Sequence, residues 1–196
     1  YQVSRAPAAS PTISTNSIDV ASTGIYYTDS TASAAAVIAG NTLTGIGGWG
    51  IYIAGAGPQA QITGNTIAGS GNGIQTVNAS PTILNNGINV TGFPLGHTGD
   101  SDPTYVGNTI AGSLYPAVLV TGAITRDMRW RLAVQEGYVL PYVVPYLTVT
   151  STGILRIDPG VAVKFQQGSA LYAQGGELVA ESVLFTSYYD DSPEAG

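Results

Sequence analysis

The chain has 196 residues, a formal net charge of −6, no cysteine, and 9% charged against 44% hydrophobic residues. This composition can fill a buried core, but it excludes disulfide frameworks and thiol chemistry. It also argues against nucleic-acid binding, which needs a clustered basic face. No apolar run approaches the roughly 20 residues that cross a bilayer, so we expect no membrane span.

A six-residue motif recurs through the first 120 residues. Each full copy has two apolar residues five positions apart with an asparagine between them. In an uninterrupted strand an odd separation puts side chains on opposite faces, so the chain must bend within the motif. The copies are ISTNSI (13–18), IAGNTL (38–43), ITGNTI (62–67), ILNNGI (83–88) and the shortened VGNTI (106–110).

The spacing of these copies predicts the fold class. Successive central asparagines are separated by 25, 24, 21 and 22 residues, and a second apolar stretch follows each of them. A period of this length without helical spacing is typical of a solenoid built from short strands. We therefore expect an all-β parallel β-helix with coils of about 21–25 residues.

The asparagines have two predicted roles at the corner of each coil. Asparagine tolerates the left-handed backbone conformation that a sharp bend needs. Asparagines stacked coil on coil can also form a ladder of side-chain amides along the axis. The predicted ladder comprises Asn16, Asn41, Asn65, Asn86 and Asn108.

The pattern stops near residue 121 and returns near residue 142. Residues 121–141 carry Arg126, Arg129 and Arg131 among acidic residues, which favours a connector. Residues 142–196 again contain short alternating strands broken by Gly and Pro. The chain therefore divides into Asn-bearing coils at 1–120, a connector at 121–141 and further coils at 142–196.

The second half resembles the opening coils of secreted bacterial right-handed parallel β-helix proteins of the pectin-lyase-like type. The resemblance rests on Tyr142, Val143 and Val144, on Leu155 through Phe165, and on Phe185 through Asp191. The first half is similar to later coils of the same superfamily. The resemblance implies the right-handed sense of the coils, which spacing alone does not fix, and an extracellular or cell-surface location.

The order of these coils departs from that superfamily, in which the opening coils come first. One explanation is that the chain is an excerpt of a longer tandem array. The other is that the last coils of one copy continue into the first coils of the next. Such a head-to-tail contact does not close on itself and builds a filament.

Catalysis finds little support in the sequence. Glycoside hydrolysis needs two carboxylates at a controlled separation, and no second acidic pair lies at the place of Asp100 and Asp102 on a neighbouring coil. His97, the only histidine, lies in a Gly-rich segment and is expected to be a solvated loop residue. We therefore expect a non-enzymatic structural protein that forms a surface fibre and is adhesive, with a polysaccharide-binding or polysaccharide-cleaving protein as the alternative.

Two acidic loops are candidate calcium sites, because clustered oxygen ligands suit Ca²⁺. The alternative for both is an ordinary solvated loop. The aromatic residues Tyr26, Tyr27, Trp49, Tyr52, Tyr188 and Tyr189 could equally form a sugar-stacking face, a contact between solenoids, or part of the core. The candidate calcium ligands are Asp100 and Asp102 in the first loop and Asp190, Asp191 and Glu194 in the second.

Overall fold

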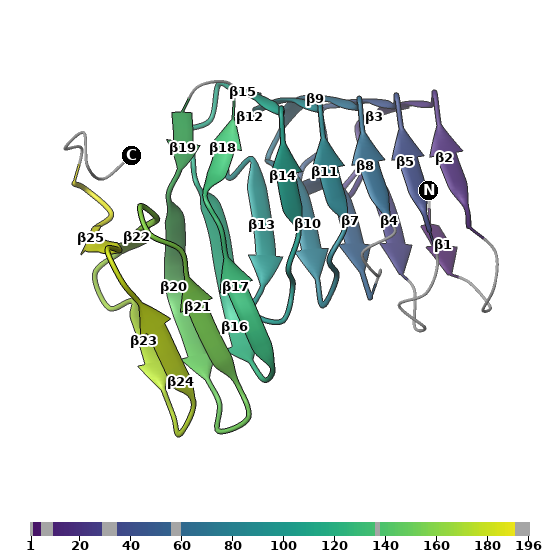
Figure 1. The fold of residues 1–196 in the computed structure, drawn as a ribbon. Coiled ribbons are helices and arrows are strands. Elements are labelled where there is room, and N and C mark those ends of the chain that lie inside the picture. Colours follow the sequence, from purple (N-terminus) through teal and green to yellow (C-terminus); the bar gives the residue numbers. More distant parts are fainter. Residues whose placement is uncertain (1, 5–9, 29–34, 56–59, 136–137, 191–196) are drawn as a thin grey trace.

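The computed structural model describes residues 2–4, 10–28, 35–55, 60–135 and 138–190. The described residues form strands and no helix, so none of them builds a helix that could span a membrane. The strands stack side by side along one axis into a rod of parallel sheets (Figure 1). The predicted all-β parallel solenoid is confirmed.

The longest sheet, here sheet A, runs along the whole rod. Its inward side chains include Ile25, Ile51 and Ile74, which lie in register on neighbouring strands and are fully buried. Its strands, in spatial order, are β1 (Gln2–Ser4), β4 (Ile25–Thr28), β7 (Trp49–Ala54), β10 (Asn72–Val77), β13 (Leu95–Thr98), β16 (Val118–Ile124), β20 (Tyr142–Val149), β22 (Ala162–Phe165) and β25 (Leu184–Ser187), with β23 (Ala170–Ala173) also paired to β20.

Two shorter sheets complete the coils of the first half, and the repeated motif forms the corner between them. Sheet B contains β2 (Thr12–Ser14), β5 (Val37–Ala39), β8 (Gln61–Thr63), β11 (Thr82–Leu84) and β14 (Thr104–Val106). Sheet C contains β3 (Ser17–Asp19), β6 (Thr42–Thr44), β9 (Thr66–Ser70), β12 (Gly87–Val90) and β15 (Thr109–Ala111). The two apolar residues of each of the four full copies therefore both point inward, one from each sheet.

The left-handed residue of each corner is the one before the ladder asparagine, which corrects the first predicted role of asparagine. Positive φ angles occur at this preceding position, and none of the five ladder asparagines has one. The bend therefore falls on the residue before the asparagine. At three corners this residue is Gly, which adopts the left-handed conformation easily, and at the other two it is Thr15 or Asn85. The residues and their φ angles are Thr15 (54°), Gly40 (61°), Gly64 (61°), Asn85 (54°) and Gly107 (60°).

The asparagine ladder is present in the structure. Within each pair, the backbone N–H and the Nδ2 of one asparagine both donate to the Oδ1 of the next, at 3.0 and 2.9 Å respectively. Each Nδ2 from Asn41 onward also donates to a main-chain carbonyl of the preceding coil, as Asn65 does to Ile38 at 2.9 Å. An interior asparagine thus satisfies two donors and two acceptor positions inside the core.

Residues 121–141 are part of the solenoid rather than a connector. β17 (Asp127–Trp130) pairs in parallel with β21 (Ile154–Ile157), which pairs with β24 (Glu177–Ala180) to form sheet D. Its charged residues Asp127 and Arg129 point outward while Met128 and Trp130 are buried. The charges belong to the outer face of an amphipathic strand, which explains the wrong prediction.

An antiparallel hairpin of β18 (Ala133–Gln135) and β19 (Tyr138–Leu140) follows β17. It lies against the end of sheet B, where β18 contacts β14. The Oε1 of Gln135 accepts the backbone N–H of Asn108 at 3.0 Å, and its Nε2 has no hydrogen-bond partner among the described residues. Gln135 therefore ends the ladder, and the hairpin covers the end of the Asn-bearing coils.

The coil period predicted for the second half is confirmed by the pairing of its strands. Leu155 lies opposite Leu178 in sheet D, and Val163 lies opposite Phe185 in sheet A. These are the two apolar pairs whose spacing matched one coil in the sequence. The cross-section differs from that of the first half, because sheet D replaces sheets B and C.

Replacing Asn65 with alanine should lower the free energy of unfolding by about 4 kcal/mol. The change leaves the N–H and Nδ2 of Asn41 without their shared acceptor in the core, and each unmet buried group costs roughly 1–3 kcal/mol. Asn16, which is exposed at the end of the ladder, is the matched control, and Asn16→Ala should cost about 1 kcal/mol. Urea denaturation measures both, and equal losses would contradict a ladder that is buried only in its interior.

Candidate functional site

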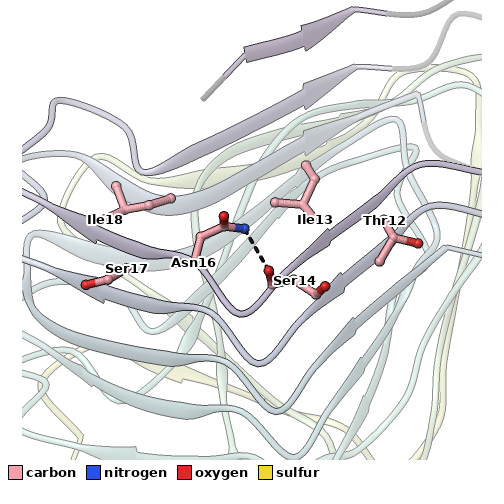
Figure 2. A pocket seen from close by; sticks show the side chains of 6 residues that line it. All are labelled: Thr12, Ile13, Ser14, Asn16, Ser17 and Ile18. Atoms are coloured by element: carbon pink, nitrogen blue, oxygen red, sulfur yellow. Dashed lines mark hydrogen bonds between the residues drawn. The ribbon is translucent and has the colours of Figure 1, made fainter.

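The first candidate site is the end of the solenoid formed by β2 and β3. In the described residues no strand pairs with the outer edge of either, since both stand last in their sheets. A groove of about 360 Å³ lies over this end and is lined by Thr12, Ile13, Ser14, Asn16, Ser17 and Ile18. Figure 2 shows these side chains and the hydrogen bond of 3.0 Å from Asn16 Nδ2 to the Ser14 carbonyl.

The opposite end of the described solenoid exposes apolar side chains. Phe185 and Leu178 are 44% and 37% exposed, although they stand in register with the fully buried Val163 and Leu155. Their exposure therefore comes from their position in the outermost coil and not from an outward orientation. Such a strand edge with apolar flanks is a surface on which a further coil can stack.

The charged residues near the middle of the rod pair with one another between coils. Arg129 Nε lies 2.6 Å from Asp158 Oδ1, and Arg156 Nε lies 3.2 Å from Asp127 Oδ1. Arg131 pairs with Asp102 in the same region. These exposed ion pairs link side chains of neighbouring coils in sheet D and of the adjoining loop. Their geometry is therefore that of surface salt bridges within the protein.

The candidate calcium ligands of the first loop make contacts within the protein. Asp100 Oδ1 accepts the backbone N–H of Thr125 at 2.7 Å, and Asp102 accepts a hydrogen bond from Arg131. Among the described residues, no three His, Cys, Asp or Glu side chains gather closely enough to hold a metal ion. Calcium binding at this loop stays a prediction.

In the second candidate loop, Asp190 is described while Asp191 and Glu194 lie outside the described residues. The carboxylate of Asp190 accepts a hydrogen bond from Thr186, and its carbonyl accepts one from Lys164 Nζ at 2.9 Å. The calcium prediction for this loop therefore stays a prediction as well.

The aromatic residues divide between the core and the surface. Tyr27 is fully buried, whereas Tyr26 and Tyr52 stack at 4.9 Å on the outer face of sheet A. A second aromatic group contains Tyr115, whose ring lies 5.1 Å from Phe93 and 6.0 Å from Tyr188. It borders a groove of about 250 Å³ that is lined by Leu114, Tyr115, Pro116, Ala117, Pro141, Val143, Lys164, Tyr188 and Tyr189.

His97 lies in the core, which corrects its prediction as a solvated loop residue. It belongs to β13, and its ring packs edge-on against Trp130 and Tyr142 at 6.3 and 6.0 Å. Its Nδ1 lies 2.9 Å from the Thr98 carbonyl, so the neutral ring carries its proton on Nδ1. Gly96 inside this strand and Gly99 directly after it obscured the strand in the sequence.

Burial lowers the pKa of His97 from 6.5 to about 4, although the hydrogen bond to Thr98 and the charge of Asp102 partly oppose this shift. A buried histidine with a low pKa is not placed to act as a base at the surface. It contributes to packing between the Asn-bearing coils and sheet D.

Acid should destabilise the protein through His97. Below pH 6.5 the unfolded chain binds a proton that the folded protein takes up only near pH 4, so this contribution to stability is lost as the pH falls between these values. The expected loss is about 3 kcal/mol. Urea denaturation from pH 7.5 to 4 measures it, with His97→Gln as the control that lacks it. The same pH dependence in both proteins would contradict this assignment.

Comparison with known proteins places this geometry in a family. The model of the right-handed β-helix region matches residues 3–123, which span the Asn-bearing coils. No curated protein and no solved structure matches the chain. The family includes both enzymes and non-enzymes, so membership alone does not decide the question of catalysis. Because the matched residues cover more than half of the sequence, this chain belongs to the right-handed β-helix family.

Proposed function

We propose that this protein is a non-enzymatic structural β-solenoid that forms part of an extracellular or cell-surface fibre. The fibre is continued at the ends of the solenoid by a neighbouring repeat or by another copy, and it is adhesive. The observation that carries this proposal is the strand pairing and side-chain exposure at the two ends of the described solenoid. In the described residues both ends have strand edges without a partner strand, and the β25 end exposes Phe185 and Leu178, whose counterparts Val163 and Leu155 the preceding coil buries.

Sheet A supports an uninterrupted fibre because it continues where the other sheets stop. At the hairpin β18–β19 the asparagine ladder ends, but β16 and β20 still pair in parallel over six residue positions. One solenoid section can therefore succeed another while this sheet remains continuous. The same pairing is available to β25, whose outer edge has no partner strand in the described part of the chain.

The charged residues support a structural role over an enzymatic one. The arginines of sheet D bind aspartates of the adjacent coil or loop, and His97 is held neutral in the core. Glycoside hydrolysis instead requires two carboxylates that face a substrate at a fixed separation. The paired carboxylates stabilise stacking between coils.

Two copies joined head to tail should form one continuous rod. Small-angle X-ray scattering should give a maximum dimension about twice that of one copy, because coaxial solenoids add their lengths. Leu178→Lys with Phe185→Lys at the joint should produce two independently oriented bodies instead. Val106→Lys, which places a charge on an exposed residue of β14 away from the joint, is the matched control.

The fibre proposal fails if the joined copies behave as independent bodies without any charge at the joint. It also fails if the purified protein stays monomeric and depolymerises acidic polysaccharides.

Polysaccharide binding is a second candidate function, favoured by the groove beside Tyr115. Flat aromatic and proline rings line this groove together with Lys164, whose Nζ donates to the Asp190 carbonyl. Pockets that combine apolar walls with a few polar groups suit small ligands such as a sugar ring. This role would give the fibre its adhesive property.

If the groove binds polysaccharide, acidic polysaccharide in a native gel should retard the protein, and Tyr115→Ala should abolish most of the retardation. Tyr146→Ala removes a comparably exposed ring from sheet A and should have no effect. Equal retardation of both variants, or none of the wild-type protein, would remove this candidate.

A further inference from the structure

The ladder ends at Asn16, whose side chain is exposed. Each interior Oδ1 accepts two hydrogen bonds from the asparagine of the preceding coil, as Asn65 Oδ1 does from the N–H and Nδ2 of Asn41. No described residue donates to Asn16 Oδ1, while the Asn16 N–H and Nδ2 donate inward to Asn41. The ladder is therefore directional, and at this end Asn16 Oδ1 offers an acceptor to an incoming coil.

The apolar residues beside Asn16 continue the inward rows of the interior coils. Ile13 and Ile18 form the inward rows of sheets B and C, where they lie in register with Ile38 and Leu43 of the next coil. Both line the groove at this end of the rod. A coil stacked there would place one apolar side chain over each of them, as the next coil does on the other side.

We propose that the groove over β2 and β3 binds a parallel β-coil that carries an asparagine at its corner. The coil is of the type apolar-x-x-Asn-x-apolar and gives its asparagine N–H and Nδ2 to Asn16 Oδ1. The chain itself shows this interface four times, between the successive asparagines from Asn16 to Asn108, with nearly constant distances. The inference rests on the proposed function, because it names the neighbour that continues the rod.

The same chemistry discriminates between possible neighbours. No asparagine follows Asn108 in the sequence, and the coils of the second half have sheet D in place of sheets B and C. The second half of another copy can therefore extend sheet A, but it cannot continue the ladder. The ladder end selects an Asn-bearing coil, such as one from a different repeat.

The nature of the edges argues for a β-coil over other partners. Parallel pairing at β2 and β3 would satisfy backbone groups that no described strand pairs, which is how an added strand gains affinity. The described side chains that line this groove are apolar or uncharged, so they offer no charge to a polyanion or a charged peptide.

A synthetic peptide tests the inference in trans on the intact chain. Its sequence is that of residues 60–70, AQITGNTIAGS, which contains one complete corner. The peptide should shift the amide NMR signals of residues 12–18 and leave those of residues 177–187 unchanged. The matched control has Asp in place of Asn65, which removes the Nδ2 donor and should weaken binding about tenfold or more.

A fusion keeps the test decisive if a short peptide binds too weakly. Gln2 and Gln75 occupy equivalent positions, because both register with the row of Tyr26 and Tyr52 in sheet A. Residues 60–74 can therefore be joined directly to Gln2 without changing the register. The added coil should raise the urea midpoint of unfolding, and the Asn65→Ala version of that coil should not.

The inference is overturned if the Asn and Asp peptides bind equally well, or if the two fusions have equal urea midpoints. It is also overturned if the shifted signals belong to the opposite end of the rod. These outcomes are separate from those of the joined copies, which test whether the rod continues but not which coil the ladder selects.

Discussion

The stacking of buried asparagine amides is the constraint on which the rest of the structure depends. A side chain at this corner must offer two donors and two acceptor positions at a distance that matches the strand spacing of about 4.8 Å. Asparagine meets this requirement with its Nδ2 and Oδ1, and its backbone N–H adds a further hydrogen bond to the Oδ1 of the next coil, so each coil fixes the register of the next. The apolar residues of sheets B and C on either side of the asparagine are thereby also held in register from coil to coil.

Much of the first half could be predicted because the ladder admits one residue type at one spacing. The separations of 21–25 residues gave the coil, and the five-residue gap between apolar positions indicated the corner. The mechanism of the bend was predicted wrongly. The residue before asparagine adopts the left-handed conformation, because the asparagine itself must point inward. A sequence pattern shows which residues recur, but two adjacent recurring positions can exchange their roles.

The middle of the chain shows where pattern reasoning fails. Residues 127–130 read as a charged connector because their charges were considered without their alternation, which places Met128 and Trp130 in the core. Gln135 was missed because it is not asparagine and lacks the flanking pair of apolar residues. His97 was misplaced because its neighbouring glycines suggested a loop. In each case a tertiary contact decides the environment, and it is made with a residue one or more coils away.

The two ends of the solenoid are physically different, and this asymmetry gives the proposed fibre a direction. One end combines an amide acceptor with apolar rows, whereas the other exposes mainly apolar side chains of sheets A and D. Stacking at either end uses interactions that the interior of the rod already contains. The arginines in and beside sheet D pair with aspartates within the protein, so the chemistry that the two ends offer is mainly that of stacking.

The central claim is that the interior asparagine side chains are buried, hydrogen-bonded members of a ladder. Side-chain amide hydrogen exchange, followed by NMR, tests it most directly. The Nδ2 protons of Asn41, Asn65 and Asn86 should exchange orders of magnitude more slowly than those of the exposed Asn89. Exchange of all four at similar rates would contradict it.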